Sequence, residues 1–439
     1  MRRGRLFSTL ACALVVMTEA SAHASPEDLF GYGARSSAMG ATGTAVARDF
    51  EAAYTNPALL SLIRSRKLSL GLFGAIQRPT LDGQSVGIGS SKGITIGADL
   101  PLPLGGVLKD RIAFGIAMYT PSDLIVRGRI LYPEKAQFPI VDRAASVTVR
   151  SAMGIDLGYG FRAGAGFAVL AQIVGSAVVA TDATGKVGTR VEDQLVATYS
   201  PALGLSYDVP FDPSYRVGIA YRGVLDARFN VSIDATKLSS LNLPVFNISG
   251  LAQYDPEQVA VEFARVQPRR SWAIGATWKH WSRYPGPIEP TLSCPDDSPD
   301  CGALVPPKLE LSNGIALRAG AEQRLSIDSR VDLALRGGAF VETSPLPSGL
   351  PSSGAFSPAT SSLVDVPTRY YDADKVGLSL GAGIAFTNGF APLTFDLFAQ
   401  WQALLPRTFA SSDPSGKVLS TGEAGGHLAA FGVSSGVKF

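Results

Sequence analysis

The sequence predicts an all-β protein, a transmembrane antiparallel β-barrel of about fourteen strands with a small N-terminal hatch inside its lumen. Three observations favour this class. Long stretches alternate apolar and polar residues with a period of two. The connections between these stretches alternate between very short and very long, and the final stretch ends on an aromatic residue, Phe439.

The N-terminus has the features of a secretory signal peptide. Arg2, Arg3 and Arg5 precede an apolar run over 6–17, and the small-residue site Ala22-His23-Ala24 follows. We therefore expect residues 1–24 to be removed. Cleavage takes away three arginines and one glutamate and brings the formal charge from +2 to zero, so the chain has no electrostatic footprint for nucleic acid.

The composition requires a choice between a soluble core and a membrane barrel. The chain is 46% hydrophobic and contains 47 glycines. After the leader, no apolar run approaches the ~20 residues that a membrane helix needs. The nearest candidate, Gly166–Ala180, is too short and is interrupted by Gln172. The period of the hydrophobic pattern then decides between the two.

That period is two over unusually long stretches. In one stretch the apolar residues are Val217, Ile219, Tyr221, Leu225, Ala227, Phe229, Val231 and Ile233, with Arg216, Arg222, Asp226 and Arg228 among the polar residues between them. The same pattern recurs over 272–279, 315–324, 330–336 and 394–403. Strands in globular sheets are usually only ~5–6 residues long, which disfavours the alternative of a soluble β-sandwich or propeller. An apolar outside and a polar inside indicate a transmembrane barrel.

The pattern divides into fourteen expected strands, an even number as in single-chain bacterial barrels. They lie near 66–76, 92–100, 110–119, 144–160, 163–180, 194–209, 214–234, 256–266, 269–284, 308–325, 328–343, 374–388, 391–407 and 425–439. Minimal connections such as Phe161-Arg162 and Ser326-Ile327 are expected on the periplasmic side. The long connections 120–143, 237–255, 285–307, 344–373 and 408–424 are expected outside the cell. Residues 66–439 form the barrel in this interpretation, and residues 25–65 precede it as a hatch or plug.

The last strand and the cysteines are consistent with a protein of the bacterial outer membrane. In the last strand His427, Phe431, Val433 and Phe439 share one face, and a terminal aromatic of this kind resembles the strand that barrel-insertion machinery reads in bacterial outer-membrane proteins. Cys294 and Cys301 are the cysteines that remain after the leader, and we expect a local disulfide between them in an oxidising compartment. The acidic residues between them are an alternative Ca²⁺ site.

The N-terminal residues 31–60 carry a family resemblance. A Gly/Ala-rich stretch leads through Ala47-Arg48-Asp49 to the triplet Asn56-Pro57-Ala58 just before the first expected strand. This stretch resembles the plug of the FadL/TodX family of outer-membrane fatty-acid and hydrocarbon transporters. Residues 215–222 look like the family's seventh strand, and residues 372–379 resemble the start of its twelfth. The resemblance therefore covers essentially the whole mature chain.

The resemblance implies passive uptake through a hatch-gated barrel in the Gram-negative outer membrane. Asn56, Pro57, Ala58 and Asp49 are then hatch or gating residues, with a simple turn as the alternative for Asn56. The resemblance also implies a side opening near a kink in the third strand, for which Gly115 and Pro121 are candidates. The alternative is that Gly115 packs against a neighbour and Pro121 begins an outer loop.

Candidate ligand contacts follow from residue type. Leu29, Phe30 and Tyr32 offer apolar surface for a lipid tail, or simply fill the lumen. A fatty-acid carboxylate would need a cation, and by pattern the candidates are Lys308, Arg318, Lys279 and Arg150. The alternative is that these charges pair with one another along the inner wall.

The inventory of catalytic groups argues against an enzyme. His280 and His427 are the histidines of the mature chain, and there is no G-x-S-x-G element, metal-ligand cluster or phosphate-binding glycine loop. We expect no metal and no cofactor. The expected ligand is a long-chain fatty acid or, as an alternative, an aromatic hydrocarbon, and the lipid and lipopolysaccharide of the membrane surround the barrel. Rival interpretations are a surface-assembly or secretion-accessory barrel of the same fold, and a general porin.

Overall fold

A closed β-barrel forms the body of the molecule. The computed structural model describes residues 26–86, 90–122, 147–181, 187–237, 245–284, 288–293, 310–357, 362–367, 372–386 and 392–439. Within these residues fourteen antiparallel strands form a ring. They are β1 (Lys67–Leu81), β3 (Ser91–Pro101), β4 (Ile112–Pro121), β5 (Thr148–Gly158), β6 (Phe161–Thr181), β7 (Val187–Asp208), β8 (Tyr215–Arg222), β11 (Gln258–Val266), β12 (Arg270–Lys279), β14 (Gly314–Ser326), β15 (Val331–Glu342), β18 (Lys375–Phe386), β19 (Leu393–Ser412) and β20 (Val418–Lys438).

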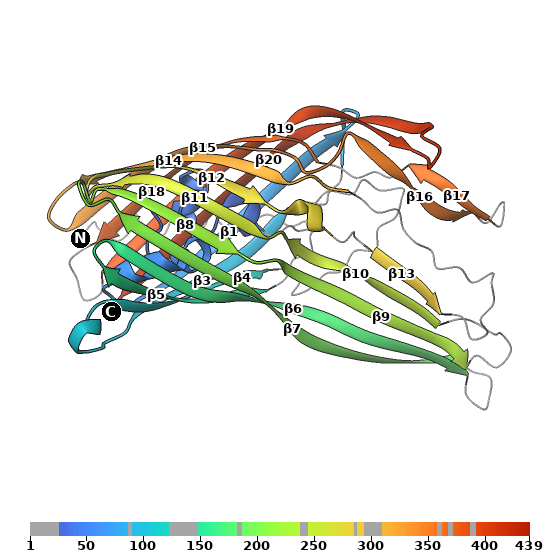
Figure 1. Ribbon diagram of the computed structural model, residues 1–439, viewed down its shortest axis with the longest axis horizontal. Helices are drawn as coiled ribbons and strands as arrows, with labels where there is room; N and C mark the ends of the chain where they lie inside the picture. The colour runs from blue at the N-terminus through green and yellow to red at the C-terminus, as the bar shows by residue number, and fades with distance from the viewer. Residues whose placement is uncertain are drawn as a thin grey trace, which may run out of the picture.

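The first and last strands close the ring. β1 pairs with β20 from Lys67 opposite Lys438 to Leu81 opposite Ala424. The C-terminus lies at the end where the connections are short, for example Tyr159-Gly160 between β5 and β6 (Figure 1). We call this the short-turn end and the opposite one the long-loop end.

The alternation of residues orients the two faces of the wall. On β1, Leu68, Leu70 and Leu72 point outward and are 54%, 53% and 47% exposed, whereas Lys67 and Ser69 are buried inside. Because a large apolar band around a closed ring is stable only in lipid, this surface indicates a membrane protein. The predicted transmembrane barrel is confirmed.

Six further strands extend or flank the long-loop end. β2 (Gln84–Ser85) forms a hairpin with β1, and β16 (Gly349–Ser357) pairs with β17 (Ser362–Pro367) and with the end of β19. On the other side, β9 (Leu225–Lys237), β10 (Val245–Asp255) and β13 (Ile288–Ser293) add to β6 in that order and form a projecting outer sheet (Figure 1).

The prediction of one continuous strand over 214–234 was wrong. β8 ends at Arg222, where the Gly223 amide donates to the carbonyl of Pro201 on β7 at 2.9 Å. The chain then crosses β7 and β6, and β9 pairs in parallel with the far edge of β6 from Ile173 onward. That edge of β6 is open because β5 begins at Thr148, opposite Leu170. Both halves alternate with the same period, so the break left no signal in the pattern.

Several expected loops contain regular structure. The expected strand 269–284 ends at Lys279, and a 3-10 helix, η3 (Trp281–Arg283), follows. The expected loop 408–424 is instead mostly a hairpin, because β19 continues to Ser412 and β20 starts at Val418. The expected loops 237–255 and 344–373 likewise contain β10, β16 and β17. Their Gly, Ser and Pro content suggested turns, but pairing with long neighbouring strands satisfies the backbone.

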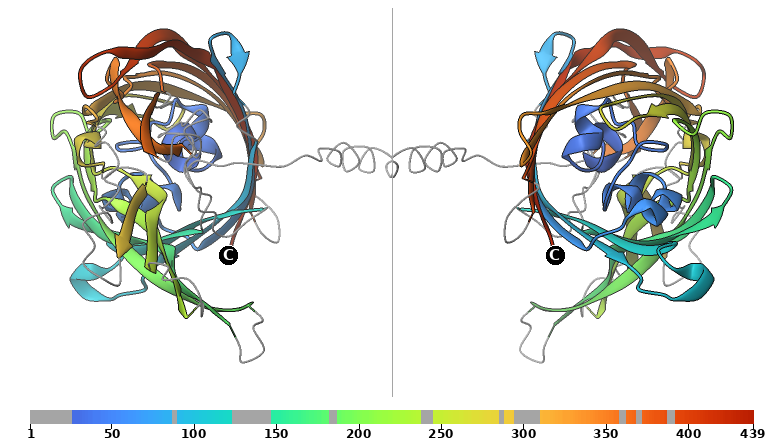
Figure 2. Two further views of the ribbon diagram at one scale, coloured as in Figure 1. Left: turned by 90° about the vertical axis from the view of Figure 1, so that its right-hand side faces the viewer. Right: turned by 90° about the vertical axis from the view of Figure 1, so that its left-hand side faces the viewer.

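The segment before β1 lies inside the ring. It forms four short helices, α1 (Pro26–Phe30), α2 (Ala34–Ala38), α3 (Glu51–Thr55) and the 3-10 helix η1 (Pro57–Leu62). Figure 2 shows these helices, in blue, within the circle of strands. We call residues 26–62 the N-terminal segment. None of the described helices is long and apolar enough to cross a membrane.

Candidate functional site

Asn56 joins the N-terminal segment to the wall. Its Nδ2 donates to the carbonyls of Thr44 at 2.6 Å and Leu205 on β7 at 2.9 Å, while its Oδ1 accepts from the Ala58 amide at 3.1 Å. All three bonds are inside the protein, where an unpaired amide would be costly. Gly204 makes this approach possible, because a Cβ there would lie 2.0 Å from the Asn56 Oδ1.

The other expected hatch residues surround this anchor. Pro57 is the first residue of η1, where its missing N–H costs nothing, and Ala58 is fully buried. Asp49 has a left-handed backbone, with φ of +55°, and accepts from Lys67 Nζ on β1 at 2.6 Å. The structure thus places all four residues in the boundary between segment and wall. Their gating role stays a prediction.

Acidic wall residues hold the segment at two further points. Glu262 on β11 accepts from the amides of Gly43 and Ala45 at 2.9 and 2.8 Å. Glu322 on β14 accepts from Arg35 Nε at 2.9 Å and Arg336 Nε at 2.8 Å, and it also contacts Arg324 and Arg48. The alternating pattern marks both glutamates as inward-facing, but their partners could not be predicted from it.

Uncharged wall residues complete the attachment. Ser379 on β18 accepts from the Gly40 amide at 2.8 Å and donates to the Ala38 carbonyl at 3.0 Å. Gln402 on β19 donates to the Leu29 carbonyl at 2.9 Å. Gln400, two residues away on the same face, donates to the carbonyls of Phe30 and Ser37. These bonds satisfy backbone groups at the ends of the short helices, which have few partners of their own.

The expected cationic ligand contacts are already paired. Lys279 Nζ lies 3.0 Å from Asp28 of α1 and 2.8 Å from Glu342 on β15. Arg318 donates to Thr277 at 3.0 Å and lies 3.3 Å from the same Glu342. A ligand carboxylate would have to displace these carboxylates, so the structure supports the alternative in which the wall charges pair with one another.

Arg150 lies deeper and stacks on an aromatic ring. Its guanidinium lies 4.5 Å from the centroid of the Tyr54 ring, and that of Arg222 lies 4.3 Å from the same ring. Such cation–π contacts stabilise buried guanidinium groups. Arg150 is itself 7% exposed, so it forms part of the packing of α3 against the wall. Lys308, the fourth expected cation, lies outside the described residues.

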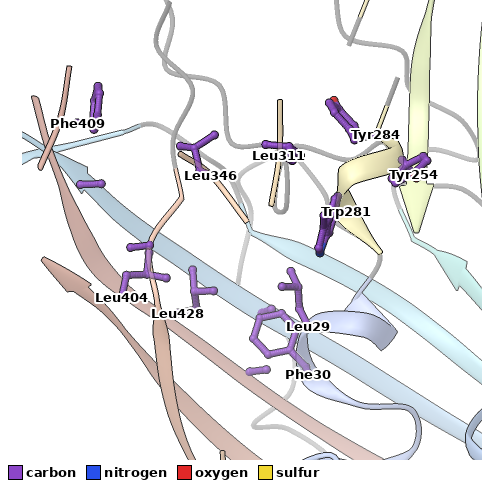
Figure 3. Packing of buried hydrophobic residues seen from close by; sticks show 14 of the residues in the cluster. Leu29, Phe30, Tyr254, Trp281, Tyr284, Leu311, Leu346, Leu404, Phe409 and Leu428 are labelled. Atoms are coloured by element: carbon purple, nitrogen blue, oxygen red, sulfur yellow. The ribbon is translucent and has the colours of Figure 1, made fainter. Parts of the chain in front are cut away.

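A cluster of buried apolar side chains occupies the lumen at the long-loop end. We call it the outer cluster, and Figure 3 shows ten of its residues with labels: Leu29, Phe30, Tyr254, Trp281, Tyr284, Leu311, Leu346, Leu404, Phe409 and Leu428. Leu29 and Phe30 of α1 form its floor and face Leu404 and Leu428. The rings of Tyr254, Trp281 and Tyr284 pack together with centroids 5.2–6.2 Å apart. Sequence reasoning found the two floor residues but missed the three aromatic rings, because Tyr254 comes from an expected loop and Trp281 and Tyr284 from the end of the expected strand 269–284.

Tyr32 lies below this cluster. Its hydroxyl donates to the Met118 carbonyl at 3.0 Å, and its ring stacks on Tyr54 at 5.2 Å and meets Phe50 edge-on. It is thus part of the packing inside the N-terminal segment. Of the three expected apolar contacts, the outer cluster contains Leu29 and Phe30.

A charged chamber occupies the lumen at the short-turn end. It has a volume of about 550 Å³, and its lining includes Arg48, Asp49, Lys67, Asp99 and Asp396. A cavity with this lining holds water readily. The N-terminal segment therefore lies between an apolar cluster on the outer side and a hydrated chamber on the inner side.

β4 is the third strand of the barrel and contains both candidate kink residues, Gly115 and Pro121. β4 pairs with β3 from Ala113 to Pro121 without a shift of register, and with β5 from Ile112 to Tyr119. A Cβ at Gly115 would lie 2.6 Å from Leu60 Cδ2, so this glycine makes room for η1. Pro121 is the last residue of β4. The side opening stays a prediction.

The remaining expectations concern residues that are not described. The leader 1–24, Cys294 and Cys301 lie outside the described residues. Within the described ranges, no group of three or more His, Cys, Asp or Glu side chains could hold a metal ion.

Comparisons with known proteins agree with this architecture. No family model matches the chain, and no curated protein matches it in sequence. Solved structures do match in fold. A Pseudomonas aeruginosa FadL homologue is 16% identical with a TM-score of 0.61, over 93% of this chain and 98% of that one.

Two further matches have similar coverage. The P. putida toluene transporter TodX is 14% identical with a TM-score of 0.54, and the Ralstonia pickettii toluene transporter TbuX is 16% identical with a TM-score of 0.51. Each covers 94% of this chain and 99% of the other. The chain therefore has the FadL-type barrel fold, as the resemblance of its N-terminal residues implied.

Proposed function

We propose that this chain is a passive channel for hydrophobic small molecules in the outer membrane of a Gram-negative bacterium. The observation that carries the proposal is the outer cluster, a set of apolar side chains inside a membrane barrel whose floor is formed by Leu29 and Phe30 of the N-terminal segment. In this proposal the N-terminal segment is the hatch, and the short-turn end faces the periplasm.

The outer surface supports the placement in a membrane. Exposed aromatic residues near the long-loop end of the barrel include Tyr199, Trp278 and Trp401, which suit the level of the lipid headgroups. The fold shared with the FadL homologue and TodX supports the same orientation.

An uncharged ligand fits the site better than a fatty acid. The outer cluster contains aromatic and aliphatic side chains, and the nearest expected cations, Lys279 and Arg318, are engaged with carboxylates. Leaving a ligand carboxylate without a partner in such a space is costly. Two of the matching structures are described as toluene transporters, which supports aromatic hydrocarbons. We therefore favour these over the long-chain fatty acids that the sequence suggested first.

Equilibrium binding to the detergent-purified full barrel tests the proposal, with toluene and oleate as probes. We expect saturable toluene binding that weakens at least about tenfold in Leu346→Asp, because an unpaired buried carboxylate costs more than the roughly 1.4 kcal/mol that a tenfold ratio represents. Leu346 is 2% exposed in the outer cluster. Leu104→Asp, the same change in an exposed turn, is the matched control and should bind like wild type.

The outcomes separate the candidate functions. Saturable oleate binding without toluene binding would favour a fatty-acid transporter instead. Absence of saturable binding for both probes would contradict transport and favour the rival, a surface-assembly barrel of the same fold.

A further inference from the structure

Four guanidinium groups share one carboxylate at the short-turn end of the lumen. Glu322 on β14 lies directly opposite Arg336 on β15, and Arg324 follows two residues later on the same inward face of β14. The N-terminal segment adds Arg35 and Arg48, whose guanidinium nitrogens lie 2.9 and 3.9 Å from the Glu322 carboxylate. All four arginines line the charged chamber. We call them the arginine cluster.

The chamber supplies too little negative charge for this cluster. Eight of its lining residues are basic and five are acidic. Of the acidic residues, Asp396 pairs with Arg336 at 2.6 Å, whereas Asp49 pairs with Lys67 at 2.6 Å. Among the described residues, four guanidinium groups therefore have two carboxylates, Glu322 and Asp396, as direct partners. The cluster keeps an excess of two positive charges.

Three of the four guanidinium groups have capacity for a further partner. The side chains of Arg48 and Arg324 are 33% and 35% exposed, so they reach the hydrated chamber. The Arg35 side chain is 8% exposed, and its Nη2 has no hydrogen-bond partner among the described residues. Burial and the neighbouring guanidinium groups of Arg35 and Arg324 lower the pKa of Arg48, because like charges crowd it. An added anion would satisfy the free donor and relieve the crowding.

We propose that the arginine cluster binds a phosphate group, either as inorganic phosphate or as a small phosphate monoester. Guanidinium groups bind phosphate through paired N–H donors, and their planar geometry matches its oxygens. A phosphate group carries about two negative charges near neutral pH, which equals the excess of the cluster, whereas a carboxylate would neutralise half of it.

The position of the site gives the bound anion a structural effect. Arg35 and Arg48 belong to the N-terminal segment and Arg324 belongs to the wall, so one phosphate group ties the two together. The chamber, at about 550 Å³, has room for the anion and its water, and its exposed lining residues Arg64 and Ser65 lie at the short-turn end. The site is separate from the outer cluster, so this inference goes beyond the proposed function.

Isothermal titration of the detergent-purified full barrel tests the site. The probes are inorganic phosphate and glycerol 3-phosphate, each added at constant low ionic strength in sodium chloride. We expect one saturable site per chain. Arg48→Gln and Arg324→Gln should each weaken it about tenfold or more, because each removes a charge-assisted hydrogen-bond donor. Two variants are used because Arg324 lies on the wall, where its loss does not alter the fold of the N-terminal segment itself.

Arg64→Gln is the matched control. It removes the same charge from the lining of the same chamber. The Arg64 guanidinium donates to the carbonyls of Ser61 and Ile63 and is not part of the arginine cluster. Phosphate should therefore bind to this variant within about twofold of wild type, because the loss of one distant, hydrated charge is screened.

Hydrogen exchange measures the tie between segment and wall. Phosphate should slow exchange of the amides of residues 43–51 severalfold in wild type, because a ligand that binds the folded arrangement stabilises it. The same concentration should have no effect in Arg324→Gln. Exchange that phosphate leaves unchanged in wild type would contradict the bridging position of the anion.

The remaining outcomes are distinct. Tighter binding of glycerol 3-phosphate would assign the site to a phosphate monoester, and tighter binding of phosphate would assign it to the inorganic ion. Absence of saturable binding for both probes would overturn the site, as would an equal weakening in Arg64→Gln. Equal binding of acetate would show general attraction of anions and would overturn the phosphate assignment. Toluene binding is a separate measurement, so it can fail or succeed independently of this site.

Discussion

The two ends of the lumen differ in chemistry although the same strands build both. β19 and β20 contribute Leu404 and Leu428 to the outer cluster, and the same strands contribute Asp396 and Ser434 to the charged chamber. All four side chains face inward. The period of two therefore decides which residues face the lumen, and the position along the strand decides which solvent they meet. The N-terminal segment is the boundary between the two regions.

The largest effect on the boundary between the two regions should come from Glu322→Ala. Four arginines, Arg35, Arg48, Arg324 and Arg336, lie within 3.9 Å of this buried carboxylate. Without it their charges repel one another, so we expect a loss of about 3–5 kcal/mol in the stability of the folded barrel. The segment should also loosen and let ions pass between the two regions.

Thermal unfolding and single-channel conductance measure these two effects. Glu310→Ala removes a carboxylate from an exposed position and is the control, which should behave like wild type. Wild-type conductance in Glu322→Ala would show that other contacts alone hold the boundary.

An intermediate effect is expected from Asn56→Ala. The change removes two donated bonds and one accepted bond, and it leaves the carbonyls of Thr44 and Leu205 without this partner. We expect a destabilisation on the order of 2 kcal/mol. Hydrogen exchange of the amides of residues 43–58 should accelerate more than that of the strands.

Asn56→Asp tests the two donated bonds. The aspartate still accepts from the Ala58 amide, but it places a buried carboxylate oxygen against the two carbonyl oxygens, so exchange should be at least as fast as in Asn56→Ala. Rates equal to wild type would mean that the two donated bonds contribute nothing.

The smallest effect is expected from Asp49→Asn. Asparagine tolerates the left-handed backbone of this position as well as aspartate does, so the change removes the charge and leaves the turn. The Asp49 side chain is 28% exposed at the edge of the chamber, and a partly hydrated ion pair contributes about 1 kcal/mol or less. Urea unfolding at low and high salt should show a small difference that shrinks with salt. If Asp49→Asn lost as much stability as Glu322→Ala, water would not reach the Asp49–Lys67 ion pair, and the chamber would be drier than its lining indicates.

The sequence allowed the barrel and the direction of its side chains to be predicted because both depend on local alternation. Lys279 and Arg318 were expected to face inward, and they do. Their partners were not predictable, since Asp28 and Glu342 lie far away in the sequence and pair with Lys279 only once the ring has closed. The candidate site shows the same limit: its floor was found in the N-terminal residues, whereas Tyr254 and Leu346 come from segments that were expected to be loops.

Contacts between the N-terminal segment and the wall could also not be predicted from local sequence patterns. Gly204 and Gly338 sit at inward positions of their strands, where they look like weak points. Their role is visible only with Asn56 and Met39 placed against them, because each leaves the space that the segment occupies. The chain contains 47 glycines, but composition does not say which of them face a partner.

The crossing between β8 and β9 separates two parts of the molecule that can evolve independently. β9, β10 and β13 belong to the connections that follow β8 and β12, and none of their ladders contributes to the closed ring. The outer sheet can therefore lengthen, shorten or change its surface under selection by phages, antibodies or neighbouring cells. The barrel beneath it need not change, since its fourteen strands keep their own partners.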